Sequence, residues 1–283
     1  MTAAGRVLVT GATGRVGREV VAELLRAGAR VRALTRSPGT AGLPAAAEVV
    51  RGDLEDPASL APALAGVERM YLFPVPETAR EVVAMAEQAG VRRIVVLSGA
   101  LAGQEEGDEA GYRPVEIAVE ESALDWTFVR PGEFAANWLD HAPGVRDRRE
   151  VRRPFTGAVG RPTHEADIAE VAAAALLGNG HTGRIYTFGG PQELTFAEQA
   201  RIVGDAIGAE IRLLELTPEQ THEEWYAPEH GVDHAVIDWL LDLYGSTVGA
   251  RGILPDAADV ERVLGRPART FARWASDHAE DFR

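Results

Sequence analysis

The sequence predicts an α/β protein built on a doubly wound parallel sheet, with a smaller and less regular region on its C-terminal side. In the first half of the chain, valine-rich segments of strand length alternate with segments whose apolar residues recur at helical spacing. The first strand-like segment runs directly into a turn rich in glycine. The 283 residues, 46% of them hydrophobic, are also enough to bury a large core.

The strands of this sheet are predicted from short apolar runs separated by turns. These runs are Arg6–Thr10, Val31–Arg36, Glu48–Arg51, Glu68–Phe73, Arg93–Ser98 and Trp126–Arg130. Helical patterns lie between several of them, for example at Glu77–Ala89 and Val115–Ala123. Asp56 followed by Pro57 predicts the start of a further helix, because aspartate caps a first turn and proline fits its first position. The alternation implies parallel strands with helices on both faces of the sheet.

The strand and helix rhythm weakens after Pro131. We therefore expect residues 1–160 to form the sheet core, and residues 161–283 to hold the rest of this core interleaved with a smaller, less regular region. Helix starts with capping-box spacing are predicted at Thr195 with Glu198 and at Thr217 with Gln220.

The composition narrows the classes of function. A formal net charge of −14 disfavours binding to a nucleic-acid backbone. Cysteine is absent, which excludes disulfides, thiolate nucleophiles and cysteine-bound zinc. The first residues do not have the pattern of a secretory signal, and the apolar stretch Ile168–Leu177 is too short to cross a bilayer. We expect a cytoplasmic protein that does not bind membranes.

The glycine turn after the first strand has the spacing G-x-x-G-x-x-G at Gly11, Gly14 and Gly17. In a Rossmann-type fold such glycines permit the tight turn, the close approach of a pyrophosphate, and the packing of helix against strand. The helix that follows offers its N-terminal N–H groups to the phosphates. The alternative is a glycine-rich turn without a ligand. The predicted cofactor contacts in this turn are Gly11, Thr13, Gly14, Arg15, Val16 and Gly17.

The end of the second strand indicates which dinucleotide is bound. Arg36 occupies the position where a site for NAD usually has a carboxylate, and a guanidinium there accommodates a 2′-phosphate. NADP is therefore the predicted cofactor, although Arg36 could also be an ordinary solvated arginine. Asp53 and Leu54, just past the third strand, are predicted to contact the adenine. Alternatively, Asp53 only opens a turn.

Several segments together resemble the NmrA-like group of atypical short-chain dehydrogenases. They are VLVTGATGRVG at 7–17, GDL at 52–54, VVLSGA at 95–100, WTFVRPGEFAANW at 126–138 and HEADIAEVAAAALL at 164–177. The similarity covers nearly the whole chain. It implies a Rossmann core that binds NADP or NAD. The group includes NAD(P)H-dependent quinone and dye reductases as well as regulators that bind a dinucleotide without known turnover.

The sequence departs from the usual catalytic pair of short-chain dehydrogenases. They pair a tyrosine proton donor with a lysine four residues later, whereas Tyr112 is followed at that spacing by Glu116. A carboxylate near a phenol raises its pKa rather than lowering it. Tyr112 is still our candidate for a proton donor or a substrate-orienting hydrogen bond, and Glu116 is interpreted as structural. Ser98 ends the fifth strand, where the superfamily often has a catalytic serine, or it simply terminates that strand.

Further site residues follow if the resemblance holds. Phe73 after the fourth strand, and Pro131, Gly132 and Phe134 after the sixth, are expected near the nicotinamide, with loop packing as the alternative. An aromatic substrate pocket is predicted from Trp138, Trp225, Tyr226 and His230, which core packing would explain equally well. The fragments HEADI and HEEWY lack the second histidine of a zinc protease motif, so no metal is predicted.

Two functions remain open from the sequence. The first is an NADPH-dependent reductase that transfers hydride to a small planar acceptor, such as a quinone or a biosynthetic enone. The second is a non-catalytic dinucleotide sensor of the NmrA type, whose partner is another protein. The partners considered for the chain are a small-molecule substrate and either a second copy of the chain, in a homodimer, or a regulatory protein. Glu116 favours the sensor and the aromatic C-terminal region favours the reductase. A lysine at position 116 that creates carbonyl reduction would show that the site is a disabled dehydrogenase.

Overall fold

The computed structural model describes residues 5–103, 111–228, 231–252 and 254–283. The described chain divides into two compact units. Unit 1 contains the chain up to Pro131 with Glu165–Phe188 and Ala258–Arg266, and unit 2 contains Gly132–His164, Gly189–Ala257 and Pro267–Arg283. The contacts therefore divide the chain at Pro131, earlier than residue 160, and the chain re-enters unit 1 twice.

A parallel sheet forms the centre of unit 1, and within the described residues it has seven strands. The strands are β1 (Arg6–Val9), β2 (Val31–Thr35), β3 (Glu48–Arg51), β4 (Val67–Leu72), β5 (Arg93–Leu97), β6 (Asp125–Pro131) and β9 (Arg184–Phe188). They lie in the order β3-β2-β1-β4-β5-β6-β9, and each pair is parallel. The predicted α/β class and six of these strands are confirmed. β9 was not predicted, and as a half-exposed strand at the sheet edge it lacks a continuous apolar run.

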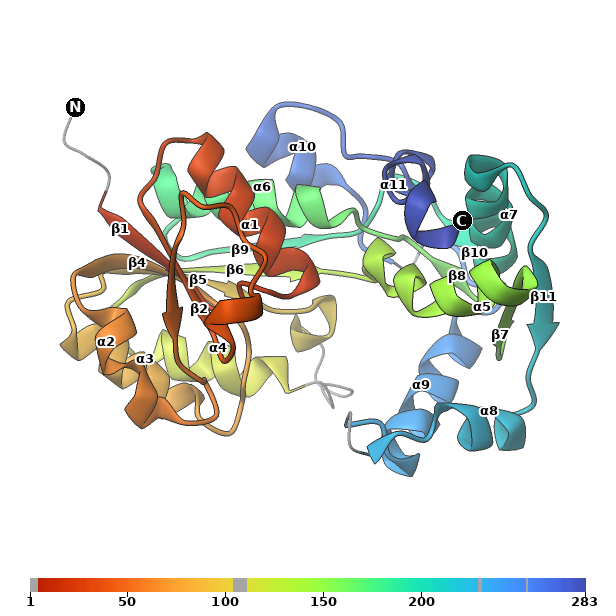
Figure 1. Cartoon of the computed structure of the whole chain (residues 1–283), viewed down its shortest axis with the longest axis horizontal. Coiled ribbons are helices and arrows are strands. Elements are labelled where there is room, and N and C mark those ends of the chain that lie inside the picture. The colour runs from red at the N-terminus through yellow and green to blue at the C-terminus, as the bar shows by residue number, and fades with distance from the viewer. Residues whose placement is uncertain (1–4, 104–110, 229–230, 253) are drawn as a thin grey trace. The chain divides into compact units, whose positions relative to one another are not determined.

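Helices cover both faces of this sheet (Figure 1). They are α1 (Arg15–Arg26), α2 (Ala61–Leu64), α3 (Ala79–Gln88), α4 (Tyr112–Glu120), α6 (Glu165–Leu177) and α10 (Ala258–Leu264), with short 3₁₀ turns η1 (Pro38–Thr40), η2 (Pro57–Leu60) and η3 (Ala100–Gly103). In Figure 1, α1 and α6 lie on one face and α2, α3 and α4 on the other. The helix expected after Asp56 begins as η2, and the Asp56 side chain does not cap it.

The core of unit 1 follows from strands that are apolar on both sides. On one face, Leu8, Met70, Ile94 and Phe128 of neighbouring strands are almost completely buried. Apolar residues of α3 and α4, such as Val83 and Val119, pack against them. Burial of both faces fixes the strand register. Because all strands run parallel, their carboxyl ends lie along one edge of the sheet.

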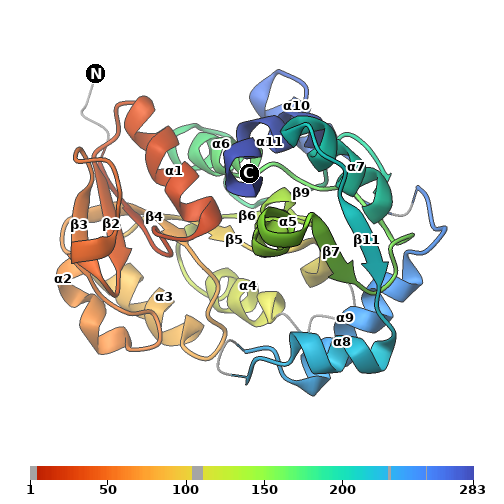
Figure 2. The ribbon, with the colours of Figure 1, turned by 45° about the vertical axis from the view of Figure 1, so that its right-hand side comes forward.

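Unit 2 is built from short elements, several of which are visible in Figure 2. They are η4 (Ala135–His141), α5 (Ala142–Arg148), β7 (Glu150–Arg153), β8 (Val159–Gly160), β10 (Leu194–Thr195), α7 (Phe196–Ile207), β11 (Arg212–Glu215), α8 (Pro218–Trp225), α9 (His234–Ser246), α11 (Phe271–Asp277) and η6 (Ala279–Phe282). β7 pairs with β11 in parallel, and β8 pairs with β10. Both predicted capping boxes are present, at the starts of α7 and α8. No helix of the described chain is long and apolar enough to span a membrane.

Candidate functional site

The sheet order of unit 1 reverses between β1 and β4, and open parallel sheets bind ligands at such a reversal. The carboxyl ends of the two strands are joined there by Thr10. Its hydroxyl donates to the Tyr71 carbonyl at 3.0 Å and accepts from the Phe73 N–H at 2.7 Å. Phe73, the first residue beyond β4, keeps 44% of its surface exposed. This edge therefore holds a hydrogen-bonded frame with an exposed aromatic ring, and contact between Phe73 and a cofactor stays a prediction.

The glycines of the turn after β1 have different physical tasks. Gly11 has φ +58°, a conformation that side chains disfavour. A Cβ at Gly17 would lie 2.1 Å from the Gly11 carbonyl oxygen, so Gly17 is required for packing. A Cβ at Gly14 would meet the same oxygen at 3.2 Å, and Gly14 is exposed. The missing side chain of Gly14 therefore leaves its backbone exposed at the turn, and contact of this backbone with a ligand stays a prediction.

The N-terminus of α1 fits a phosphate group. Gly14 is its N-cap, without a side-chain hydrogen bond, and the first turn contains no acidic residue. The positive end of the helix dipole is therefore not compensated by its own first turn. Arg15 is exposed at this end, whereas the Val16 side chain is 5% exposed, so Val16 can contribute only its backbone. The residues present fit a dinucleotide pyrophosphate.

Arg36 directly follows β2 and is exposed. Among the described residues it has no ion-pair partner, so its guanidinium is available to an anion. Thr35 is buried, and its hydroxyl accepts from the Ser37 N–H at 3.2 Å. This hydrogen bond fixes the start of the loop that carries Arg36.

The predicted adenine contacts lie in the turn after β3. A carboxylate oxygen of Asp53 accepts from the Glu55 N–H at 3.1 Å, which is the turn-opening role of the alternative interpretation. Leu54 is 7% exposed and packs in the core of unit 1. A buried side chain offers little surface to a ring, so Leu54 acts mainly in packing. Contact between Asp53 and adenine stays a prediction.

A buried polar cluster joins β5, α4 and β6. The Ser98 hydroxyl donates to Glu116 Oε1 at 2.6 Å, and Arg130 donates to the same carboxylate through Nε at 2.8 Å and Nη2 at 2.5 Å. Arg113 reaches Glu116 Oε2 at 3.3 Å from the helix surface. The Ser98 and Glu116 side chains are completely buried. Charge-assisted hydrogen bonds of this bidentate kind are among the strongest in proteins.

This cluster corrects the catalytic role predicted for Ser98. A hydroxyl has a single proton to donate, and the proton of Ser98 is directed to Glu116 inside the core. Ser98 therefore holds the end of β5 to α4 and does not protonate a substrate. The structural interpretation of Glu116 agrees with its burial. The sequence analysis did not identify Arg130 as the partner of Glu116. The available signal is a charged residue at the end of an otherwise apolar strand, which indicates a buried ion pair.

Tyr112 is the first residue of α4 and lies at the same edge of the sheet. A Cβ on Gly99, two residues beyond β5, would come within 2.4 Å of the Tyr112 ring, so the ring packs closely against that backbone. Gly111, with φ +71°, caps α4 and directs the chain into it. Tyr112 thus lies beyond the carboxyl end of β5, where the prediction requires it, and its role in proton transfer stays a prediction.

The residues predicted after β6 belong partly to unit 2. Pro131 ends β6, whereas Gly132 and Phe134 begin unit 2. The Phe134 backbone forms a bridge with Thr163. Their contact with a nicotinamide stays a prediction.

The structure corrects one of the predicted substrate contacts. Trp138 is 2% exposed, stacks on Phe196 with ring centroids 4.4 Å apart, and donates its indole N–H to Gln199 at 2.6 Å. It therefore packs the core of unit 2. Trp225 packs edge-on against Tyr244.

Tyr226 has the opposite character. It is 47% exposed and stacks on His234 with ring centroids 4.4 Å apart. Substrate contacts by Trp225 and Tyr226 stay predictions, and His230 lies outside the described residues.

Unit 2 has a buried titratable cluster of its own. The Arg153 guanidinium lies 3.9 Å from the ring centroid of Phe196 and 4.4 Å from that of Tyr244. Burial raises the pKa of Glu133, and burial, with the charge of Arg153, lowers the pKa of His141 to about 4. His141 packs edge-on against Phe196. A neutral histidine thus packs against the aromatic core of unit 2.

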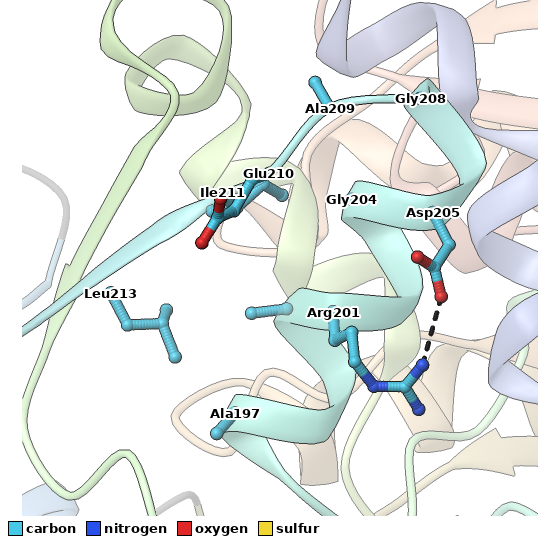
Figure 3. A pocket seen from close by; sticks show the side chains of 10 residues that line it. Ala197, Arg201, Gly204, Asp205, Gly208, Ala209, Glu210, Ile211 and Leu213 are labelled. Carbon is cyan, nitrogen blue, oxygen red and sulfur yellow. Dashed lines mark hydrogen bonds and ion pairs between the residues drawn. The ribbon is translucent and has the colours of Figure 1, made fainter.

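A groove also lies on unit 2, between α7 and the segment leading into β11 (Figure 3). Small and apolar residues such as Ala197, Gly204 and Ile211 line it together with the charged side chains of Arg201, Asp205 and Glu210. Arg201 pairs with Asp205 at 3.1 Å, so Glu210 gives the lining a net negative charge. The groove therefore lacks the features of the edge of unit 1, where a glycine turn, an uncapped helix and an available arginine come together.

The fold and this edge define an atypical short-chain dehydrogenase/reductase, with the usual lysine replaced by a buried glutamate. The chain belongs to a family of NAD(P)H-binding proteins, whose sequence profile matches residues 11–178. The resemblance to the NmrA-like group is confirmed, because its members share this fold over nearly the whole chain.

Two relatives that align with the chain over nearly its whole length are named as reductases. The chain is 38% identical to the (4-alkanoyl-5-oxo-2,5-dihydrofuran-3-yl)methyl phosphate reductase of Streptomyces griseus, over 98% of this chain and 99% of that one. It is 33% identical, over the same shares, to the NAD(P)H azoreductase of Xenophilus azovorans. An NADPH-dependent quinone oxidoreductase of Escherichia coli has the same fold, with a TM-score of 0.77 and 25% identity over 96% of this chain and 98% of that one. The prediction of an NAD(P)H-dependent oxidoreductase is thus confirmed.

Proposed function

We propose that this protein is an NADPH-dependent reductase of small, planar, conjugated acceptors such as quinones and enones. The observation that carries the proposal is the buried Ser98–Glu116–Arg130 cluster. It occupies the place of the serine and lysine with which short-chain dehydrogenases activate a carbonyl. An acceptor that spreads the incoming electrons over a conjugated system needs less help from such an acid.

A bound reduced nicotinamide would supply hydride at this site. The residues of unit 1 have the task of binding and orienting. The Gly14 backbone and the N-terminus of α1 would hold the pyrophosphate, and Arg36 the 2′-phosphate. Thr10 keeps the ends of β1 and β4 together, and the Phe73 ring forms an apolar wall that excludes water. Tyr112 would donate a hydrogen bond to the acceptor oxygen.

The chemistry of the acceptor explains why this set is sufficient. When hydride adds to the β-carbon of an enone, the electron pair of the double bond moves to the carbonyl oxygen and leaves an enolate. A hydrogen bond from Tyr112 stabilises that charge, and water can deliver the final proton. Reduction of an isolated ketone instead produces an alkoxide, which requires a strong general acid.

The relatives support this substrate class. The name of the Streptomyces griseus reductase describes a dihydrofuranone whose double bond is conjugated with carbonyl groups, and the Xenophilus azovorans enzyme is named for an azo group. The Escherichia coli quinone oxidoreductase has been solved with NADPH. The compounds in these three names share a conjugated, electron-poor double bond, and we propose this feature for the acceptor here.

The proposal is tested by NADPH oxidation with a panel of quinones, butenolides, azo dyes and simple ketones. We expect turnover with the conjugated acceptors and little with the ketones, and a modest dependence on pH between about 6 and 9. Tyr112→Phe should lower kcat by about 10- to 100-fold with little change in NADPH affinity. Tyr186→Phe is the matched control, because it removes a tyrosine hydroxyl that bonds to His181 at the edge strand β9 and belongs to no proposed contact. Tight NADPH binding without turnover on any acceptor would contradict the proposal and favour the dinucleotide sensor.

A further inference from the structure

The Arg18 side chain connects two loops of unit 1 that are distant in sequence. It projects from the first turns of α1, and its Nε donates to the Thr13 carbonyl at 2.9 Å. Its Nη1 donates to the Gly42 carbonyl at 3.0 Å and its Nη2 to the Ala41 carbonyl at 2.9 Å. A planar guanidinium suits this arrangement, because its N–H groups point in fixed, divergent directions in one plane.

One of these loops is the glycine turn, since Thr13 lies between Gly11 and Gly14. Its carbonyl is the last acceptor before the N-cap of α1. The Gly14 N–H donates back to the Gly11 carbonyl at 2.9 Å, so the turn is closed internally. Arg18 holds this closed turn from the outside, through its Thr13 carbonyl.

The other loop carries Arg36. It leaves β2 at Thr35, passes through η1, and reaches Ala41 and Gly42. Its start is fixed by the hydrogen bond from the Ser37 N–H to the Thr35 hydroxyl, and the Ala41 N–H donates to the Pro38 carbonyl at 3.3 Å. Its far end is held by Arg18. The loop that presents Arg36 is therefore fastened at both ends, and one fastening comes from α1.

The charge of Arg18 is not neutralised by a carboxylate within the described residues. In the part of the chain that the structure describes, no carboxylate pairs with it, and its partners are neutral carbonyls. The guanidinium thus adds positive electrostatic potential beside the N-terminus of α1. It does not bind an anion directly, because its N–H groups donate to the carbonyls of the two loops.

We propose that Arg18 is a positioning residue for cofactor choice, which makes the glycine turn and the Arg36 loop one preformed cradle for the pyrophosphate and the 2′-phosphate. This inference rests on the proposed NADPH-dependent function. The Arg36 loop loses its conformational entropy during folding rather than when the cofactor binds. Preorganisation of this kind increases the affinity for the cofactor. NADH, which has no 2′-phosphate, gains from the ordered glycine turn alone.

The experiment is a double-mutant cycle measured by titration calorimetry with NADPH and NADH. Arg18→Lys keeps the charge and removes the planar fork, and Arg36→Ala removes the proposed phosphate contact. We expect Arg18→Lys to weaken NADPH binding by about tenfold and NADH binding by about threefold or less. In the Arg18→Lys background, Arg36→Ala should cost much less NADPH affinity than it does in the parent, because the loop no longer presents Arg36.

The matched control is Arg26→Lys, at the other end of α1, where arginine pairs with Glu23. It should bind both dinucleotides like the parent. Hydrogen exchange gives a second readout without cofactor. The amides of residues 36–42 should exchange faster in Arg18→Lys and not in Arg26→Lys.

The outcomes separate this inference from the proposed function. If the parent prefers NADPH and the effects of Arg18→Lys and Arg36→Ala simply add, Arg18 is not acting through Arg36 and the inference is wrong while the function stands. If Arg18→Lys binds NADPH like the parent, the fork has no role and the inference is again wrong. Equal parental affinities for NADPH and NADH would overturn the proposed cofactor choice, and this inference with it.

Discussion

Replacing Glu116 by glutamine tests whether the buried cluster at the end of β5 stabilises the fold. Glu116→Gln keeps the shape of the side chain and removes its charge. The change leaves the Arg130 guanidinium, whose side chain is 11% exposed, without its carboxylate partner. It also replaces the acceptor of the Ser98 hydroxyl by a neutral amide.

The size of the effect follows from burial. Removing one member of a buried ion pair costs about 3–5 kcal/mol, because the remaining charge is desolvated and unpaired. The glutamine carbonyl can still accept one of the hydrogen bonds, so we expect a loss of about 2–4 kcal/mol. With a urea m-value of about 3 kcal/mol/M, the unfolding midpoint should fall by about 1 M.

The control lies one helical turn along α4. Glu120 pairs with Arg113 at 3.0 Å, but both side chains are about one third exposed. Glu120→Gln should therefore cost less than about 1 kcal/mol. Both variants are measured by urea unfolding followed by circular dichroism. In the double variant Glu116→Gln/Arg130→Met, the total loss should be smaller than the sum of the single losses, because no unpaired cation remains.

Equal midpoints for Glu116→Gln and Glu120→Gln would refute the reasoning, as would strict additivity with Arg130→Met. The same geometry predicts the outcome of placing a lysine at position 116. The ammonium would be buried against Arg130 and close to Arg113, so like charges would replace an ion pair. We expect Glu116→Lys to lose the folded state rather than gain an activity.

The remaining predictions concern the cofactor turn and the core of unit 2. Arg36→Ala should remove most of the preference for NADPH over NADH, about 1–3 kcal/mol by calorimetry, and an unchanged preference would exclude a phosphate contact. Gly14→Val should abolish dinucleotide binding while the circular dichroism spectrum is retained, whereas Gly17→Ala should lower the thermal midpoint, because its Cβ would collide with the backbone. His141 stays neutral in the fold down to about pH 4, but in the unfolded chain it takes up a proton near pH 6.5. The contribution of the neutral His141 to the free energy of unfolding is thus fully present above pH 6.5 and is lost as the pH falls toward 4. His141→Phe should flatten the decline of stability over this range by about 1–2 kcal/mol in urea titrations, and an unchanged slope would contradict the burial of a neutral imidazole.

Much of the cofactor site could be read from the sequence because its requirements are local. A positive φ at Gly11, close backbone packing at Gly17 and an open backbone at Gly14 are conditions on single residues, and glycine meets them. The valine-rich strands and the capping boxes of α7 and α8 depend likewise on neighbours within a few positions.

Contacts between distant residues could not be read in the same way. A tryptophan such as Trp138 looks the same in the sequence whether it lines a pocket or packs in a core. Only its stacking on Phe196 and its hydrogen bond to Gln199 place it in the core. The burial of Leu54 in the core of unit 1 is likewise decided only by the tertiary structure. A single apolar side chain does not reveal which surface it faces.

The sequence by itself determined the sheet class, the glycine turn and the arginine at the end of β2, because backbone geometry and periodicity are encoded residue by residue. Only the tertiary structure decided that Glu116 pairs with Arg130, that the proton of Ser98 is directed inward, and that Arg18 holds carbonyls 23 and 24 positions away. The physical reason is that a hydrogen bond depends on distance in space. That distance is set when strands and helices pack, and no local pattern contains it.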